Sequence, residues 1–264
     1  MCRLLGVISA EPISVEDAVG AHVLKDFVAL TKVHGDGWGI AAADGDAEPL
    51  VHVSAASAVD DPAFITHMRD WRADASIVHL RWATSGLAVQ PQNSHPFLAD
   101  GLAMAHNGSI KPADPLEALL DPAVAATLRG TTDSERYFGV IRGHRARTAV
   151  LAKAVRDAVA ELRTRYPDAS LNALILGEGQ LVAVHANARS RLSVEDAAEI
   201  TAADLPAEHL EDYFGLRWAR SDTGALVVGS TGFGDLDWQP LPPESVTAIS
   251  LHDQVMTTLP VMAD

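Results

Sequence analysis

The sequence predicts an α+β fold in which helices cover a sandwich of two sheets. Short apolar runs typical of strands fill the first half, two helical stretches follow residue 132, and strand patterns return after residue 170. Such blocks favour an α+β arrangement over alternating βαβ units. We expect a single domain over residues 1–264, a length within the range of one layered domain.

Strands in the first half are expected where short apolar runs are bounded by turn residues. These runs cover residues 4–9, 38–43, 50–53, 77–82 and 102–106. A helix is expected from Asp61 to about residue 72, with Pro62 in its first turn. An acidic residue followed by Pro115 predicts another helix start over residues 114–120.

The middle of the chain predicts two helices. Thr132 can cap the first, with Glu135 three residues later, and the second is expected over residues 148–166, stopped by Pro167. A short helix or loop is expected at 204–212. Further strands are expected at residues 171–176, 181–185, 216–219, 226–229, 246–251 and 254–259.

Composition and charge narrow the classes of function. The 35 acidic and 20 basic residues give a net charge of −15, which disfavours binding to nucleic acid or anionic membranes. No apolar run approaches the roughly 18 residues of a membrane span and no signal-peptide pattern is visible, so we expect a cytoplasmic protein. One cysteine excludes an internal disulfide, and the histidines form no HxxxH or HExxH pattern. The sequence therefore predicts no metal site and no cofactor.

Cys2 is the sole cysteine, next to a removable Met1. Removal of Met1 leaves one residue carrying a thiol, with a reference pKa of about 8.5, and an α-amine, with one of about 7.7–8.0. Such an amine can act as the base for its own side chain. The alternative is an incidental residue, but an apolar strand pattern follows that would hold Cys2 in place.

Two further segments allow a functional or a plain structural interpretation. The glycine-rich residues 34–39 predict either a loop that closes over a substrate or a turn into the strand at Trp38. Strand periodicity places His79 and Arg81 on one face and Trp82 on the other. Arg81 can grip a carboxylate in bidentate fashion, or it can lie on a solvent-facing surface.

The segment 106–108 and the helix start at Asp133 also leave two interpretations each. Asn107-Gly108 is a strong hairpin signal, but the Asn107 amide and the Gly108 N–H could also form an oxyanion hole. Helix capping explains Thr132 and Glu135 but does not require Asp133. The Asp133 carboxylate could instead hold an ammonium group.

Taken together and in this order, these segments resemble the class II glutamine amidotransferases. The shared motifs are Met-Cys-Arg at 1–3, Asp-Gly-Trp-Gly at 36–39, Arg-Trp-Ala-Thr at 81–84, His-Asn-Gly at 106–108 and Thr-Asp-Ser-Glu at 132–135. The family consists of N-terminal-nucleophile hydrolases with a four-layer αββα sandwich of two mainly antiparallel sheets. The tail, with Ser230, Trp238 and Pro242-Pro243, is similar to the small standalone branch. Ser85 replaces a histidine of larger members, which bears on substrate detail.

The resemblance implies a role for each motif residue. Cys2 corresponds to the nucleophile, and Asn107 with Gly108 to the oxyanion hole. The residues that correspond to the substrate-binding positions are Arg81 for the α-carboxylate, Asp133 for the α-ammonium, and Trp82, Thr84 and His106 for the pocket lining. The expected reaction is glutaminase-like cleavage of a small γ-glutamyl amide through a Cys2 thioester, which releases glutamate.

Three versions of that function stay open. The first is a glutamine amidotransferase that passes ammonia to a partner synthase, since the glutaminase-like fold is expected to use all 264 residues. The second is a hydrolase of a larger γ-glutamyl conjugate, as in ergothioneine biosynthesis. The third is a non-catalytic relic that binds glutamine.

Overall fold

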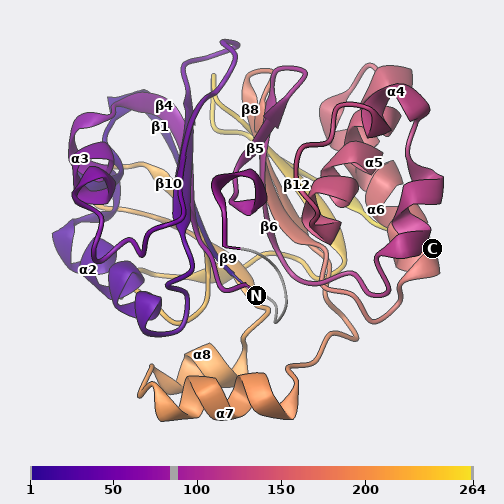
Figure 1. Ribbon diagram of the computed structural model, residues 1–264. Helices are drawn as coiled ribbons and strands as arrows, with labels where there is room; N and C mark the ends of the chain where they lie inside the picture. The colour runs from indigo at the N-terminus through magenta and orange to yellow at the C-terminus, as the bar shows by residue number, and fades with distance from the viewer. Residues whose placement is uncertain (1, 84–88, 263–264) are drawn as a thin grey trace.

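Two sheets packed face to face form the centre of the molecule, and helices cover both outer faces (Figure 1). The computed structural model describes residues 2–83 and 89–262, so Thr84, a predicted pocket residue, lies outside the described part. The order of layers is helix, sheet, sheet, helix, and the paired strands run antiparallel. The predicted four-layer αββα sandwich is confirmed.

The first sheet has seven strands in the order β11-β9-β10-β1-β4-β2-β3. Its strands are β1 (Arg3–Ile13), β2 (Trp38–Ala43), β3 (Leu50–Ser54), β4 (Ala73–Leu80), β9 (Leu216–Arg220), β10 (Leu226–Ser230) and β11 (Gln239–Pro240). The N-terminal strand β1 therefore lies in the middle of the sheet, between β10 and β4. A central strand is paired on both sides, which fixes the position of the residue that precedes it.

The second sheet has six strands in the order β13-β12-β8-β7-β6-β5. Its strands are β5 (Phe97–Ala99), β6 (Leu102–Asn107), β7 (Asn172–Gly177), β8 (Gln180–His185), β12 (Ser245–Ser250) and β13 (Met256–Pro260). The hairpin of β7 and β8 turns through Glu178 and Gly179, both with positive φ. A two-residue turn with positive φ at both positions is typical of a β-hairpin.

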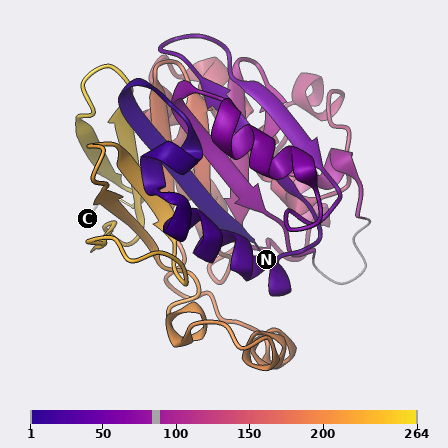
Figure 2. The same ribbon diagram turned by 90° about the vertical axis from the view of Figure 1, so that its left-hand side faces the viewer.

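Helices occupy three places around the sheets (Figures 1 and 2). Helices α1 (Val15–Val19), α2 (Ala21–Ala29) and α3 (Pro62–Asp70) cover the first sheet, and α5 (Asp133–Arg147) and α6 (Leu151–Arg165) cover the second. Helices α7 (Val194–Ala202) and α8 (Ala207–Glu211) lie beyond one end of the sandwich. Shorter segments are α4 (Pro122–Ala125) and the 3-10 turns Leu30–Lys32, Pro91–Asn93 and Asp114–Leu119. No helix of the described segments has the length and hydropathy needed to cross a membrane.

The period-two pattern of β1 divides its side chains between two cores. Leu5 and Val7 pack with the helices over the first sheet. Leu4 and Ile8 pack between the sheets, against residues such as Leu174 of the second sheet. Cys2 continues this even-numbered series, so its thiol belongs to the end of the layer between the sheets.

Every predicted strand and helix is present, with ends shifted by a few residues and with a 3-10 helix at Asp114–Leu119. The elements that were not predicted are α1, α2, α4, α7, β5 and β11. The missed signal occurs twice as the sequence Ser-Val-Glu-Asp-Ala, at 14–18 and 193–197. In both places the serine hydroxyl caps the helix, accepting a hydrogen bond from the backbone of Asp17 or Asp196. A serine cap followed by acids is a helix-start signal in its own right.

Candidate active site

Cys2 lies where the two sheets come together at one end of the sandwich. Only 6% of the residue is exposed. Its backbone nitrogen donates to Oδ1 of Asn107 over 3.0 Å. Since Cys2 leads into β1 of the first sheet and Asn107 ends β6 of the second, this hydrogen bond joins the sheets at the thiol.

The segment after β6 is not a hairpin turn. β6 pairs with β7, which begins only at Asn172, so the hairpin interpretation of Asn107-Gly108 is wrong. A Cβ at Gly108 would lie 2.0 Å from the carbonyl oxygen of Ser170, so only glycine fits. The Ser170 hydroxyl in turn donates to the Asn107 carbonyl over 2.8 Å. In the described part of the chain nothing accepts from Nδ2 of Asn107, which leaves this amide donor available beside Cys2.

The His106 ring is fully buried and has both nitrogens in use. Its Nε2 lies 2.9 Å from the carbonyl oxygen of Ser170 and must donate, so Nδ1 accepts from the Ser134 hydroxyl at 2.8 Å. Burial lowers the pKa of His106, while the nearby Asp133 carboxylate opposes the shift. These contacts fit a neutral ring that positions Asn107. His106 was expected to touch substrate, but both of its nitrogens already have protein partners.

Arg81 follows β4 and is only 3% exposed, so the solvent-facing alternative is wrong. Hydrogen bonds tie Arg81 to the glycine-rich segment: its backbone pairs with Asp36 and Gly37 at 2.9 and 2.8 Å, and its guanidinium reaches the Asp36 carbonyl at 3.3 Å. The Asp36 carboxylate also accepts from the backbone of Ala83. The contacts favour a fixed turn over a loop that closes on substrate.

Asp133 begins α5 directly behind the residue that caps the helix. Thr132 accepts from the Glu135 backbone over 3.1 Å, as predicted, and the Glu135 carboxylate accepts from two backbone amides of the preceding loop. Asp133 points elsewhere, because its Oδ2 accepts from the backbone of Ile110 at 2.5 Å. The carboxylate is therefore held beside the segment that follows Gly108.

Arg3 is a buried cation. The sequence analysis named it only as part of the Met-Cys-Arg motif and gave it no role. Its guanidinium donates to the carbonyl oxygens of Cys2, Tyr213 and Thr231 and stacks 3.9 Å from the centre of the Tyr213 ring. Burial is the main cause that lowers the pKa of nearby His209 to about 3, and the charge of Arg3 adds to it. Arg3 thus links the backbone of Cys2 to the backbone of Tyr213 and Thr231, more than 200 residues later in the chain.

Two other buried residues close to Cys2 were outside the sequence prediction. His79 of β4 and His95 face each other, with Nε2 of His79 3.0 Å from Nδ1 of His95. Sequence spacing gave no signal, because the rings come from separate segments that only the sheet packing brings together. Burial, followed by the charge of Arg81 on His79 and of His79 on His95, lowers the pKa of both rings.

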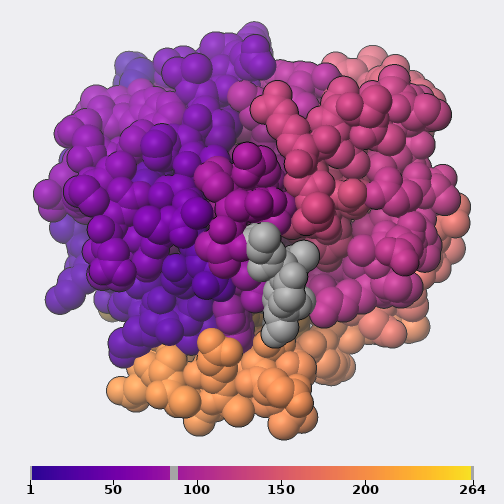
Figure 3. Space-filling model, viewed as in Figure 1, coloured from indigo at the N-terminus to yellow at the C-terminus, as the bar shows by residue number. Residues whose placement is uncertain are grey.

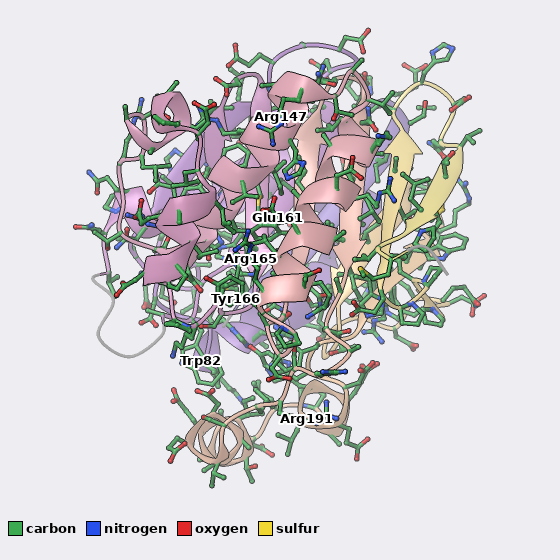
Figure 4. The ribbon with its side chains drawn as sticks, turned by 90° about the vertical axis from the view of Figure 1, so that its right-hand side faces the viewer. Trp82, Arg147, Glu161, Arg165, Tyr166 and Arg191 are labelled. Atoms are coloured by element: carbon green, nitrogen blue, oxygen red, sulfur yellow. The ribbon has the colours of Figure 1, made fainter. Side chains whose placement is uncertain are left out.

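A cleft of about 880 Å³ lies between the lower end of α6 and helix α7. Figure 4 shows Arg165 and Tyr166 at the end of α6, with Trp82 and Arg191 below them toward α7. Helices α7 and α8 lie at the bottom of the molecule, against its body (Figure 3), and Ile200 of α7 packs with Val33 and Trp82. Trp82 and Ser109, which line the cleft, neighbour Arg81 and Gly108, so the cleft adjoins the predicted site.

Two hydroxyls on this cleft have no hydrogen-bond partner within the described residues, those of Ser109 and Tyr166. The charged lining contains both signs: Lys111, Arg165, Arg191, Asp168, Glu195, Asp196 and Glu199. Such a surface can take a polar or charged group larger than an amide nitrogen. These residues belong to no motif that the sequence analysis singled out.

Comparison with known proteins gives the same assignment across nearly the whole chain. A family model described as class II glutamine amidotransferases matches residues 1–260. The glutamine–fructose-6-phosphate aminotransferase of Acidithiobacillus ferridurans is 30% identical over 174 residues, which are 65% of this chain and 28% of that protein. The chain therefore spans less than a third of the length of this relative.

Two solved structures share the fold. A glutamine aminotransferase class-II domain protein from Silicibacter pomeroyi superposes with a TM-score of 0.63 at 19% identity, covering 99% of this chain and all of that one. The glutamine phosphoribosylpyrophosphate amidotransferase of B. subtilis gives a TM-score of 0.65 at 15% identity, covering all of this chain and 50% of that one.

Proposed function

Because the chain belongs to the class II glutamine amidotransferases, we propose that it hydrolyses a γ-glutamyl amide through a thioester on Cys2. The observation that carries the proposal is the 3.0 Å bond between the Cys2 nitrogen and Oδ1 of Asn107. With Oδ1 occupied, the Nδ2 donor of Asn107 is left for a developing oxyanion. The nucleophile and its oxyanion donor are thus held together before substrate arrives.

The reaction follows from these positions. Removal of Met1 frees the α-amine of Cys2, which takes the thiol proton as sulfur attacks the γ-carbonyl carbon. Asn107 Nδ2 and the Gly108 N–H stabilise the tetrahedral oxyanion. The C–N bond then breaks, the departing nitrogen takes the proton from the α-amine, and a thioester is left. Water attacks the thioester, its proton returns to Cys2, and glutamate is released.

Substrate recognition in this proposal uses the two ends of a γ-glutamyl group. Arg81 binds the α-carboxylate and Asp133 the α-ammonium, with Trp82 along the pocket wall. Both charged side chains are already held by backbone contacts, to Asp36 and Ile110 respectively. Preformed charges of this kind bind a zwitterion with little loss of side-chain entropy.

A second candidate is a hydrolase of a larger γ-glutamyl conjugate, and the cleft beside Trp82 favours it. A cleft of about 880 Å³ exceeds what ammonia as leaving group requires. Its lining carries both signs of charge and hydroxyls that have no partner among residues 2–83 and 89–262. Under the first candidate, a partner synthase takes the ammonia. Comparing glutamine with γ-glutamyl anilide and γ-glutamyl peptides as substrates separates the two.

The test of the shared proposal is turnover combined with intact mass. We expect active protein to lack Met1, to release glutamate from a γ-glutamyl amide, and to form a thioester adduct detectable by mass spectrometry. Cys2→Ser should lower kcat by about 10³-fold or more while the fold is kept, because loss of a nucleophile removes most of the catalysis. Activity in protein that retains Met1, or unchanged turnover by Cys2→Ser, would overturn the mechanism. Glutamine binding without any glutamate release would favour the relic.

A further inference from the structure

Three metal-ligating side chains meet at the nucleophile. Cys2, His79 and His95 each offer one ligand atom, and the three atoms lie within 4.8 Å of one another. The residues come from the start of β1, from β4 and from the segment before β5. All three are less than a tenth exposed.

A thiol and two imidazoles form a donor set with a known preference. Thiolate and imidazole together suit Zn²⁺ and related ions, and three protein ligands plus an open position are usual in accessible zinc sites. Bond lengths of about 2.3 Å to sulfur and 2.0–2.1 Å to nitrogen place ligand atoms about 3.3–3.7 Å apart around a tetrahedral ion. The most widely spaced ligand atoms therefore need to approach by up to about 1.5 Å, which requires movement of the side chains.

The hydrogen bonds of the two rings leave a lone pair unused. The backbone N–H of His106 donates to Nδ1 of His95 over 3.3 Å, so that nitrogen is an acceptor. His79 Nε2, at 3.0 Å from the same nitrogen, therefore donates to it. Nδ1 of His79 is then an unprotonated acceptor, buried and without a partner in the described chain. A buried acceptor left unsatisfied costs about 1–3 kcal/mol, which a bound cation would relieve.

We propose that Cys2, His79 and His95 form an inhibitory binding site for a thiophilic divalent ion such as Zn²⁺. Binding forms an S–Zn bond and releases the thiol proton to solvent, and the sulfur electron pair that attacks the substrate is then engaged with the ion. His95 binds the ion only after it exchanges either the hydrogen bonds that its Nδ1 accepts or its own ring proton for the ion. The positive charge of Arg81, close enough to act on both rings, opposes the ion, and the thiolate offsets it. Ion binding is independent of the proposed reaction, whereas inhibition rests on it.

Calorimetric titration of untagged, EDTA-treated protein with ZnSO₄ alone tests the site. We expect one ion per chain. Cys2→Ala, His79→Gln and His95→Gln should each weaken binding by more than about 100-fold, because loss of even an outer partner of a ligand costs 10–100-fold. His52 and His67 give a matched control: their rings are also 4.3 Å apart, like those of His79 and His95. His67→Gln should leave zinc affinity unchanged.

A spectroscopic readout keeps the proposal testable without activity. Co²⁺ should give a thiolate-to-cobalt charge-transfer band that is absent in Cys2→Ala. Zinc should also protect Cys2 from alkylation in the wild-type protein but not in His95→Gln. Folded Cys2→Ala, His79→Gln or His95→Gln protein, checked by circular dichroism, that binds zinc like the wild type would overturn the site. A normal zinc site in a protein without γ-glutamyl hydrolysis would instead overturn the proposed function alone.

Discussion

The centre around Cys2 and the cleft beside α7 are built in opposite ways. At the centre, buried groups from distant segments hold one another: Cys2 with Asn107, and Asn107 with Ser170. In the cleft, charged side chains of both signs are mostly unpaired with each other among the described residues, where Arg191 donates only to the neighbouring Ser190 carbonyl. In the proposed reaction, the fold fixes the groups that cleave the amide bond, while the group released can vary with the cleft lining.

The largest effect expected from this contrast concerns the two ends of the substrate. Acylating the α-amine, as in N-acetylglutamine, leaves the Asp133 carboxylate without its ammonium partner. An uncompensated charge of this kind costs about 3–5 kcal/mol, or a factor of some hundreds or more in kcat/KM. Esterifying the α-carboxylate should do the same at Arg81. The rates of glutamate release from free and blocked substrates measure the effect.

Asp133→Asn makes the substrate test specific to one carboxylate. The variant should process glutamine slowly and lose most of its discrimination against N-acetylglutamine. Asp121→Asn is the matched control, since Asp121 also stands at a helix start and caps α4 through Ala123. If the wild-type protein turned over N-acetylglutamine as fast as glutamine, Asp133 would not bind the substrate ammonium. Its carboxylate would then only accept the hydrogen bond from Ile110.

The next effect tests the fixed donor at the centre. Asn107→Ala should lower kcat by about 10²–10³-fold with little change in KM, because an oxyanion donor acts mainly in the transition state. Asn172→Ala is the control: Asn172 pairs with Asn107 across β6 and β7 and is equally buried, yet it bonds Phe214 and Ala186. The control should lower stability and spare kcat. A rise in KM alone for Asn107→Ala would make Asn107 a binding residue.

A smaller effect concerns the pH dependence of folding stability at His209, which lies near the buried cation Arg3. Burial, with help from the charge of Arg3, lowers the pKa of His209 to about 3. The unfolded chain takes up a proton as pH falls through about 6.5, while the folded state does not until about 3. Stability is therefore present above pH 6.5 and is lost as pH falls between these values, by about 2 kcal/mol from pH 7 to pH 5.

Urea unfolding at pH 7 and pH 5 measures this loss. His209→Gln should reduce the pH dependence by about the same 2 kcal/mol. His22→Gln, which changes an exposed histidine of α2, is the control and should leave it as in the wild type. An undiminished pH dependence in His209→Gln would show that other groups cause the acid sensitivity of this end.

The features that the sequence predicted differ between the centre around Cys2 and the cleft beside α7. Short continuous apolar runs predicted the strands, because the central strands are buried on both faces. Asn107, Gly108 and Asp133 could be named as candidates because each stands in a short motif at the end of an element. The His79–His95 contact could not be predicted, because it depends on packing between segments without a local pattern. The charged residues of the cleft lining were missed for the same reason, whereas helix α7 was missed although its serine cap is a local signal.

The smallest effect addresses the cleft itself. If the released group lies there, Arg191→Glu should lower kcat/KM for a γ-glutamyl anilide that carries a carboxylate, relative to the neutral anilide. A partly exposed ion pair contributes about 0.2–1 kcal/mol, so the ratio should fall by up to about fivefold and the effect should shrink at high salt.

Arg189→Glu, two residues earlier and exposed, adds the same charge outside the cleft lining and should leave the ratio unchanged. Hydrolysis of glutamine should be insensitive to both changes, since ammonia does not reach the cleft wall. An equal loss for glutamine and both anilides in Arg191→Glu would mean that Arg191 only supports the local fold through Ser190, and that the cleft does not hold the released group.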